Sequence, residues 1–136
     1  MFYLDIIDRA IIQKLSVDSR TSFLSISKEL GVSEGTVRQR VAKLQNKGII
    51  KKFSLVLGSP TLAIVQIITS SSVPTKKISE KISKLGALSV YEVTGRFTVF
   101  AIIQAENMQK LNTVLESIRA IEGVEQTETF PVLKEL

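Results

Sequence analysis

The fold of this chain is indicated first by residues 31–48, which read GVSEGTVRQRVAKLQNKG. Val37, Val41 and Leu44 recur at the spacing that places side chains on one face of a helix. Ser33 is a residue type that caps helix N-termini, and Gly48 is a type that ends helices because glycine readily adopts the left-handed conformation. The pattern predicts a helix that begins after Ser33, buries one apolar face and ends before Gly48.

Two shorter helices are predicted before this one. Asp5 can cap the first, and Ser22 can cap the second, which ends at Gly31. Their apolar positions follow the helical period and comprise Ile7, Ile11, Ile12 and Leu15 in the first helix, and Leu24, Ile26 and Leu30 in the second. Helix, tight turn and helix is the arrangement of helix-turn-helix DNA-binding modules. Along residues 49–57, apolar residues alternate with polar ones before the sequence becomes apolar. This pattern predicts a strand or wing.

Positive charge is confined to the first half of the chain. The 136 residues carry a net charge of +5. Residues 1–57 hold 10 Lys and Arg against 5 Asp and Glu, whereas residues 58–136 hold 8 of each. All of the excess charge therefore lies in the predicted helix-turn-helix module, and a polyanion is the expected partner.

The third predicted helix presents an unusual outer face. Opposite its apolar residues lie Gly35, Gln39, Ala42, Lys43 and Asn46. The small residues permit close approach to a surface, and the two amides suit the edge of an adenine. The residues predicted to contact double-stranded DNA are Ser33, Gly35, Thr36, Arg38, Gln39, Arg40, Lys43, Lys47, Lys51 and Lys52. The alternative is an ordinary solvated basic face.

A second module is predicted after Gly58-Ser59-Pro60, which gives domains of residues 1–57 and 58–136. The expected elements are strands over residues 62–69, 88–94, 97–105 and 124–132, and helices over residues 75–85 and 107–121. Their apolar stripes are Ile78, Ile82 and Leu85 in the first helix, and Met108, Leu111, Val114, Leu115, Ile118 and Ile121 in the second. This order is the ferredoxin-like βαββαβ unit, so the fold class is α+β.

Two segments of the predicted strands, residues 62–69 and residues 99–103, are nearly continuous apolar runs. Such runs are typical of strands that are buried on both faces. Two helices in this topology cover only one face of the sheet. We therefore expect the other face to pair two copies of the chain, giving a homodimer or a larger even-numbered assembly. The alternative is that the first module folds over this face. The alternation alone does not tell whether Val99 or Phe100 faces the partner.

The composition excludes several function classes. The chain contains no Cys and no His, which rules out thiol and imidazole catalysis, zinc fingers and disulfides. We predict no catalytic residue, no metal site and no cofactor. No stretch approaches the roughly 18 apolar residues of a membrane span, and no basic region precedes an apolar run at the N-terminus. We expect no membrane partner and a cytoplasmic protein.

The chain resembles the Lrp/AsnC (feast/famine) family of transcriptional regulators. In the first module the resemblance is carried by residues 4–12 (LDIIDRAII), 18–20 (DSR), 30–33 (LGVS), 36–44 (TVRQRVAKL) and 48–51 (GIIK). In the second it is carried by residues 91–95 (YEVTG) and by Val124, Thr127, Thr129, Val132 and Leu133. The resemblance implies a winged helix-turn-helix, a C-terminal domain that binds effectors and forms oligomers, and a dimer or ring of dimers on promoter DNA, often its own. Amino acids or related small molecules would modulate assembly.

One position departs from the family pattern. The hairpin glycine of the family, here Gly95, is typically followed three positions later by an acidic residue that holds the ammonium group of the effector. Thr98 occupies that position, and a neutral hydroxyl offers an ammonium group less than a carboxylate does. The candidate effector-binding residues are Gly95, Thr98, Thr127 and Thr129, with ordinary turn and strand roles as the alternative. The segment between the modules also looks shorter than is usual for the family.

These observations favour a sequence-specific transcription regulator without catalysis. The first alternative is an architectural, nucleoid-type DNA-binding protein with little sequence preference. The second is an enzyme, since sirohaem-pathway decarboxylases are built on a similar scaffold. Those enzymes rely on His, which this chain lacks.

Overall fold

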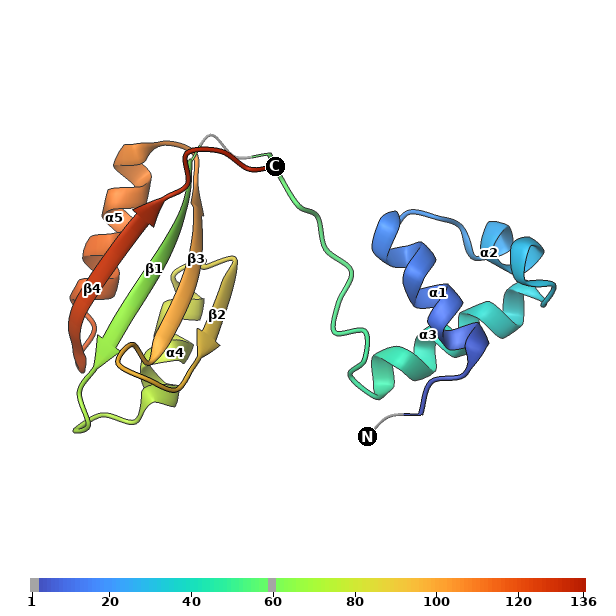
Figure 1. Ribbon diagram of the computed structural model, residues 1–136, viewed down its shortest axis with the longest axis horizontal. Coiled ribbons are helices and arrows are strands. Elements are labelled where there is room, and N and C mark those ends of the chain that lie inside the picture. Colours follow the sequence, from blue (N-terminus) through green and yellow to red (C-terminus); the bar gives the residue numbers. More distant parts are fainter. Residues whose placement is uncertain (1–2, 59–60) are drawn as a thin grey trace. The chain divides into compact units, whose positions relative to one another are not determined.

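The computed structural model describes residues 3–58 and 61–136. The chain forms two compact units (Figure 1). The division between them falls between Val56 and Leu57. The module boundary predicted at Gly58-Ser59-Pro60 includes two residues, 59 and 60, that lie outside the described residues. Among the described residues, no helix is long and apolar enough to cross a membrane.

The first unit contains the three predicted helices, α1 (Ile6–Val17), α2 (Phe23–Leu30) and α3 (Glu34–Asn46). Each begins where the sequence predicted, because the side chains of Asp5, Ser22 and Ser33 accept hydrogen bonds from backbone N–H groups of the first turn. Gly31 ends α2 in the left-handed conformation, with φ of 67°. The helix-turn-helix prediction is confirmed.

The core of this unit forms where one face of each helix packs against the other two helices. Its buried residues are Ile11, Leu15, Ile26, Val37 and Val41. Leu44 is also buried, as predicted, whereas Leu24 is 49% exposed. Leu24 lies two positions from Ile26, so a helix places it well around from the buried face. The core fixes which face of α3 remains outside.

The predicted wing is absent from the structure. Residues 51–58 are described and contain no strand, and residues 49 and 50 form a bend. The backbone N–H groups of Ile49 and Ile50 donate to the carbonyl of Leu44, which closes the end of α3. A strand needs a neighbour for its backbone groups, and none pairs with this segment within the described residues. Apolar and polar residues do alternate in this segment, but the strand predicted from that alternation was wrong.

The second unit is a four-stranded antiparallel sheet with two helices, as predicted. Its elements are β1 (Thr61–Thr69), α4 (Thr75–Lys84), β2 (Ser89–Glu92), β3 (Val99–Ala105), α5 (Met108–Arg119) and β4 (Val124–Pro131). The strand order among the described residues is β2-β3-β1-β4. This is the ferredoxin-like arrangement.

Both helices lie on the same side of the sheet (Figure 1). That face supplies Val65 and Ile67 from β1 and Val99 from β3, and these side chains pack with Ile78 of α4 and Leu111 of α5. The wider cluster also holds Ala63, Ala101, Ile103, Ile82, Leu115 and Ile118. Val99 therefore belongs to the core covered by the helices, which answers the question that alternation left open.

Two predicted core positions lie at helix ends and are partly or mostly exposed. Met108 is 58% exposed and is the first residue of α5. Leu85 is 36% exposed and follows the last residue of α4. The end of a helix has packing neighbours on one side only, so the helical period alone overestimated the length of each buried stripe.

The opposite face of the sheet carries apolar side chains that no helix of this unit covers. Phe130, Ile64 and Ile102 lie side by side across three strands, because Ile64 pairs with both of the others. Tyr91 pairs with Phe100 in the adjacent row. Ile64, Phe130 and Tyr91 are 40%, 43% and 54% exposed. We call this set of five residues the open face.

Candidate nucleic-acid interface

The outer face of α3 is the most distinctive surface of the first unit. Gly35, Gln39, Ala42, Lys43 and Asn46 are all exposed, as the sequence predicted. A Cβ atom added at Gly35 would meet no atom closer than Ser33 Oγ at 3.8 Å. The fold itself therefore tolerates a side chain at this position. A residue this small at the start of the helix leaves room for another molecule to approach the backbone.

The hydroxyl groups at the start of α3 have structural partners. Ser33 Oγ accepts a hydrogen bond from the backbone N–H of Thr36 at 3.0 Å. The same atom lies 2.8 Å from Thr36 Oγ1. Both residues were predicted to contact DNA, and in the structure they order the first turn of α3. They hold in place the backbone N–H groups at the helix N-terminus, which favour anions.

Arg38 lies on the exposed surface between α2 and α3. Its guanidinium donates to Glu34 Oε1 at 2.8 Å and lies 5.4 Å from the centre of the Phe23 ring. The side chain of Arg38 remains 65% exposed. An ion pair this exposed contributes little to stability, so Arg38 can exchange Glu34 for a phosphate at small cost.

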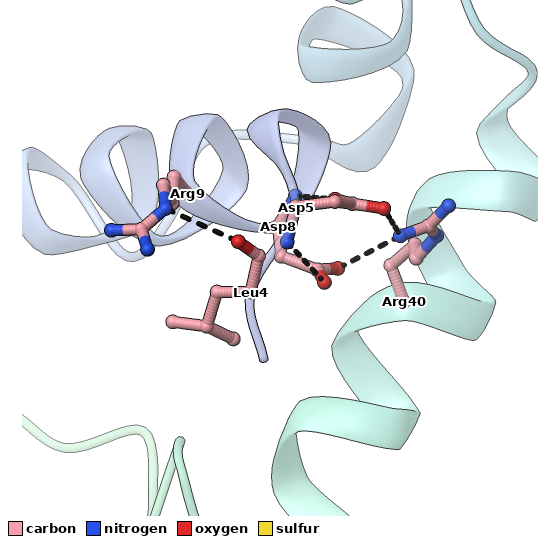
Figure 2. Close-up of polar contacts among 5 residues, drawn as sticks. All are labelled: Leu4, Asp5, Asp8, Arg9 and Arg40. Atoms are coloured by element: carbon pink, nitrogen blue, oxygen red, sulfur yellow. Dashed lines mark hydrogen bonds and ion pairs between the residues drawn. The ribbon is translucent and has the colours of Figure 1, made fainter. Parts of the chain in front are cut away.

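Arg40 is oriented differently from the other predicted DNA contacts. Its Nη1 donates to Asp5 Oδ2 and to Asp8 Oδ1, the latter at 3.2 Å (Figure 2). The two carboxylates also cap α1: Asp5 Oδ1 accepts from the backbone N–H of Asp8 at 2.8 Å, and Asp8 Oδ2 accepts from that of Asp5 at 3.4 Å. We call Asp5, Asp8 and Arg40 the clasp, since it joins the start of α1 to the middle of α3.

The clasp gives Arg40 a structural role that the sequence did not predict. The side chains of Arg40, Asp5 and Asp8 are 30%, 35% and 13% exposed. A guanidinium held by two carboxylates makes charge-assisted hydrogen bonds that a phosphate would have to replace. The structure therefore assigns Arg40 to the junction of two helices. Sequence reasoning missed Asp8 as its partner, because a pair separated by 32 residues leaves no periodic signal.

The clasp also shifts the protonation equilibria of its members. The hydrogen bond from the backbone N–H of Asp8, followed by that from Arg40, lowers the pKa of Asp5 below its usual value. The hydrogen bonds to Asp5 and then to Asp8 raise the pKa of Arg40. Both shifts favour the charged forms, so these two groups are ionised at neutral pH.

Four predicted lysines lie beyond the outer face. Lys43, Lys47, Lys51 and Lys52 are all exposed. Lys43 and Lys47 are four residues apart and line a hollow beside the clasp. Lys51 and Lys52 follow in the segment without secondary structure. The outer face of α3 is thus continued by positive charge on its C-terminal side.

The comparisons with known proteins agree with this geometry. Residues 4–45 match the AsnC-type helix-turn-helix domain, and residues 62–136 match the Lrp/AsnC ligand binding domain. The chain belongs to the Lrp/AsnC family. As a member, it is a helix-turn-helix transcription regulator with an α+β C-terminal domain.

Individual Lrp/AsnC relatives cover nearly the whole chain. It is 37% identical to the HTH-type transcriptional regulator LysM of Sulfurisphaera tokodaii, over 93% of each chain. It is 39% identical to the HTH-type transcriptional regulator FL11 of Pyrococcus furiosus, over 96% of this chain and 90% of that one. The structure of AsnC from E. coli covers 98% of this chain and 95% of its own, with 26% identity and a TM-score of 0.72. These comparisons support sequence-specific regulation and give no support to the architectural alternative.

The residues predicted to bind an effector in this Lrp/AsnC protein lie on both sides of β1. Thr127 and Val99 both pair with Ile67 of β1, from opposite edges, and Thr98 directly precedes Val99. Gly95 lies in the β2–β3 turn with φ of 129°. The structure therefore places Thr98 and Thr127 two strands apart.

The hydroxyl groups of the predicted effector residues have different surroundings. Thr98 Oγ1 lies 2.8 Å from Thr69 Oγ1. Thr127 Oγ1 accepts from Arg119 Nε at 3.2 Å, which places Thr127 on the face that the helices cover. The register gives Thr129 the same face, since it pairs with the buried Val65. Thr129 Oγ1 is buried and has no hydrogen-bond partner within the described residues.

Proposed function

We propose that this Lrp/AsnC regulator reads its operator with the outer face of α3 in the major groove. The observation that carries the proposal is the composition of that face, in which every member is exposed and two are small. Gln39 and Asn46 supply the amides that suit an adenine edge. Gly35 and Ala42 allow the helix to lie deep in the groove.

The basic residues around α3 supply the contacts to phosphate. Arg38, Lys43, Lys47, Lys51 and Lys52 are exposed and positively charged. Contacts of this kind position a recognition helix without reading sequence. Arg40 is left out of this set, because the clasp occupies its guanidinium.

The functional unit is a homodimer or a larger even-numbered assembly that pairs through the open face of the second unit. Ile64, Phe100, Ile102, Phe130 and Tyr91 form a contiguous apolar surface across the sheet. Burial contributes about 25 cal/mol for each Å2 of apolar surface removed from water. A dimer presents two recognition helices, which fits an operator with two half-sites.

An effector of this protein is not expected to be held by its ammonium group at position 98. The family position that carries an acidic residue is Thr98, which offers only a neutral hydroxyl that already contacts Thr69. Charged hydrogen bonds are roughly twice as strong as neutral ones. Free amino acids should accordingly bind weakly to a site that is formed by Gly95, Thr98, Thr127 and Thr129.

Selection of bound DNA from a random pool, with and without a mixture of amino acids, tests this function. A sequence-specific regulator enriches one motif, with an affinity at least ~10^3-fold above that for random DNA. Recovery of random sequence at moderate salt would contradict the proposal and indicate an architectural protein. Enrichment that changes with the amino acids would contradict the expectation for the effector.

A further inference from the structure

Helix α4 in the second unit carries a row of lysines on one side. Lys77, Lys81 and Lys84 are spaced by four and three residues, which places them on one face of the helix. All three are exposed. The buried residues of α4, Ile78 and Ile82, face the sheet. We call the three lysines the lysine face of α4.

The lysine face has no acidic partner within the part of the chain that the structure describes. Ion pairs of this unit involve other cations: Lys76 with Glu80 at 4.0 Å, Lys110 with Glu106 at 2.5 Å, and Arg119 with Glu116 at 2.7 Å. The second unit has no net charge, yet α4 carries four lysines against the single carboxylate of Glu80. A basic surface is therefore present on α4, although the unit as a whole is neutral.

Carboxylates of the neighbouring elements lie elsewhere. Ser79 Oγ donates to Glu92 of β2, and Ser79 lies on the flank of α4 away from Lys77, Lys81 and Lys84. Glu125 and Glu128 lie on β4, the edge strand opposite β2. Helix α4 packs against β2. Within residues 61–136, neither Glu92 nor the glutamates of β4 form an ion pair with the lysine face.

Helix stability explains only part of this lysine face. Lys81 and Lys84 lie in the last turn, where a cation is favoured by the helix dipole. Lys77 lies in the first turn, where a cation is disfavoured, and the N-cap residue Pro74 supplies no side-chain hydrogen bond. Lys77 and Lys81 also repel each other at a spacing of four residues. A ligand with dense negative charge would remove both unfavourable terms.

We propose that the lysine face of α4 contacts the phosphate backbone of DNA, outside the helix-turn-helix unit. The proposal rests on the proposed function, since DNA is the polyanion that this regulator meets. Glu80 is the one carboxylate of α4, and it pairs with Lys76 at 4.0 Å rather than with the lysine face. Lysine is a point charge that suits phosphate and carries no base-reading geometry. The contact is therefore independent of sequence.

The test measures DNA affinity as a function of salt for the full chain and for K77Q/K81Q/K84Q. Two duplexes of about 200 base pairs are compared, one with the selected motif at its centre and one of random sequence. Log K falls with log salt by about 0.9 for each phosphate contact. Loss of three contacts should lower the slope by about 2.7 on both duplexes. Between 50 and 200 mM salt, the unmodified chain should then lose about 40-fold more affinity than the variant.

Two further variants make the result specific. K76Q/K110Q/K134Q removes the same charge from the same unit at other positions and should leave the slope close to that of the unmodified chain. K77R/K81R/K84R keeps the charge of the lysine face and should retain the full slope.

An unchanged slope in K77Q/K81Q/K84Q, or an equal loss in the control, would overturn the proposal. A smaller assembly in sedimentation with an unchanged slope would also overturn it, and would identify an acidic surface of a second copy as the occupant. Failure of the proposed function is seen separately, as equal affinity of the unmodified chain for the two duplexes. In that case the comparison of slopes still decides the role of the lysine face.

Discussion

The two units of this chain are stabilised in different ways. The core cluster of the helix-turn-helix unit contains five buried apolar residues, whereas that of the βαββαβ unit contains eleven. A unit of fewer than about 60 residues buries a smaller fraction of its surface than a larger domain does and is marginally stable. The first unit compensates with polar contacts, which include a side-chain cap on each helix and the clasp. The second relies on apolar packing between a sheet and two helices.

The comparison shows how each unit remains suited to its task. A small core leaves the first unit with charged and polar residues over much of its surface, which DNA binding requires. The second unit has enough apolar residues to fill one side of its sheet and to place further apolar side chains on the open face. Five predictions test this contrast, in order of decreasing expected effect.

Val99→Asp should have the largest effect, because it places a charge in the apolar core of the second unit, where Val99 is fully buried. A buried unpaired charge costs more than about 4 kcal/mol, which approaches the whole stability of a small domain. Proteolysis should therefore degrade residues 61–136 first, while the helical signal of the first unit persists in circular dichroism.

The matched variant is Phe100→Asp, one residue along the same strand on the open face. It should keep the fold and give monomers in sedimentation velocity. A folded dimer for Phe100→Asp would contradict the assignment of the open face to assembly. A folded second unit for Val99→Asp would contradict the observed register.

Gln39→Ala should reduce the affinity for the selected operator by roughly 1 to 3 kcal/mol, because a bidentate contact to a base carries sequence information. Affinity for random DNA should barely change, and the folding midpoint should stay the same, since Gln39 is exposed. Titration of both duplexes at one salt concentration measures the difference. Equal losses on the two would show that Gln39 does not read a base.

Arg40→Met should lower the thermal midpoint of the first unit, because it leaves Asp5 and Asp8 without their cation. Loss of the clasp should also weaken specific binding, since α3 is then less well fixed against α1. The salt slope of DNA binding should not change. A slope lowered by about one would show instead that Arg40 contacts a phosphate.

Asp5→Asn tests the pH dependence of the clasp. The folded pKa of Asp5 is lowered, so its contribution to stability is present above the unfolded value near 3.9 and is lost as pH falls through the folded pKa. The first unit should therefore lose stability below about pH 4. Asp5→Asn should be less stable at neutral pH and should show a shallower loss in acid, as followed by denaturant unfolding at several pH values.

Lys52→Ala should have the smallest effect, a salt slope lower by about one on every sequence with unchanged stability. Lys52 is exposed and lies beyond α3 in a segment without secondary structure. Salt titration on operator and random duplexes measures the slope. An unchanged slope would place this segment away from DNA.

Much of the candidate site followed from local sequence signals. The caps Ser22 and Ser33, the glycine at 31 and the period of Val37, Val41 and Leu44 gave the bounds of the helices. These signals act within one or two turns, so they can be read from neighbouring residues. The outer face of α3 then consists of the residues opposite Val37, Val41 and Leu44.

The predicted strand over residues 49–57 was wrong, and the partners of Arg40 were missed, because both features depend on distant residues. The segment 49–57 has the alternation of a strand, but strand formation depends on a neighbouring strand that the described residues do not provide. Arg40 has the charge of a phosphate contact, but its partners Asp5 and Asp8 lie more than 30 residues away. Neither relation leaves a signal in the local sequence.

The sequence by itself determined the order of elements, the helix starts, the location of the excess charge and the exposed face of α3, because each depends on residues close together in the chain. Only the tertiary structure decided that Val99 faces the helices and that Phe100 lies on the open face. It also decided that β1 separates Thr127 of β4 from Thr98, which directly precedes β3. A strand alternates equally well in either register, and pairing with its neighbours selects one. The contacts of Arg40 with Asp5 and Asp8 depend in the same way on the packing of α1 against α3.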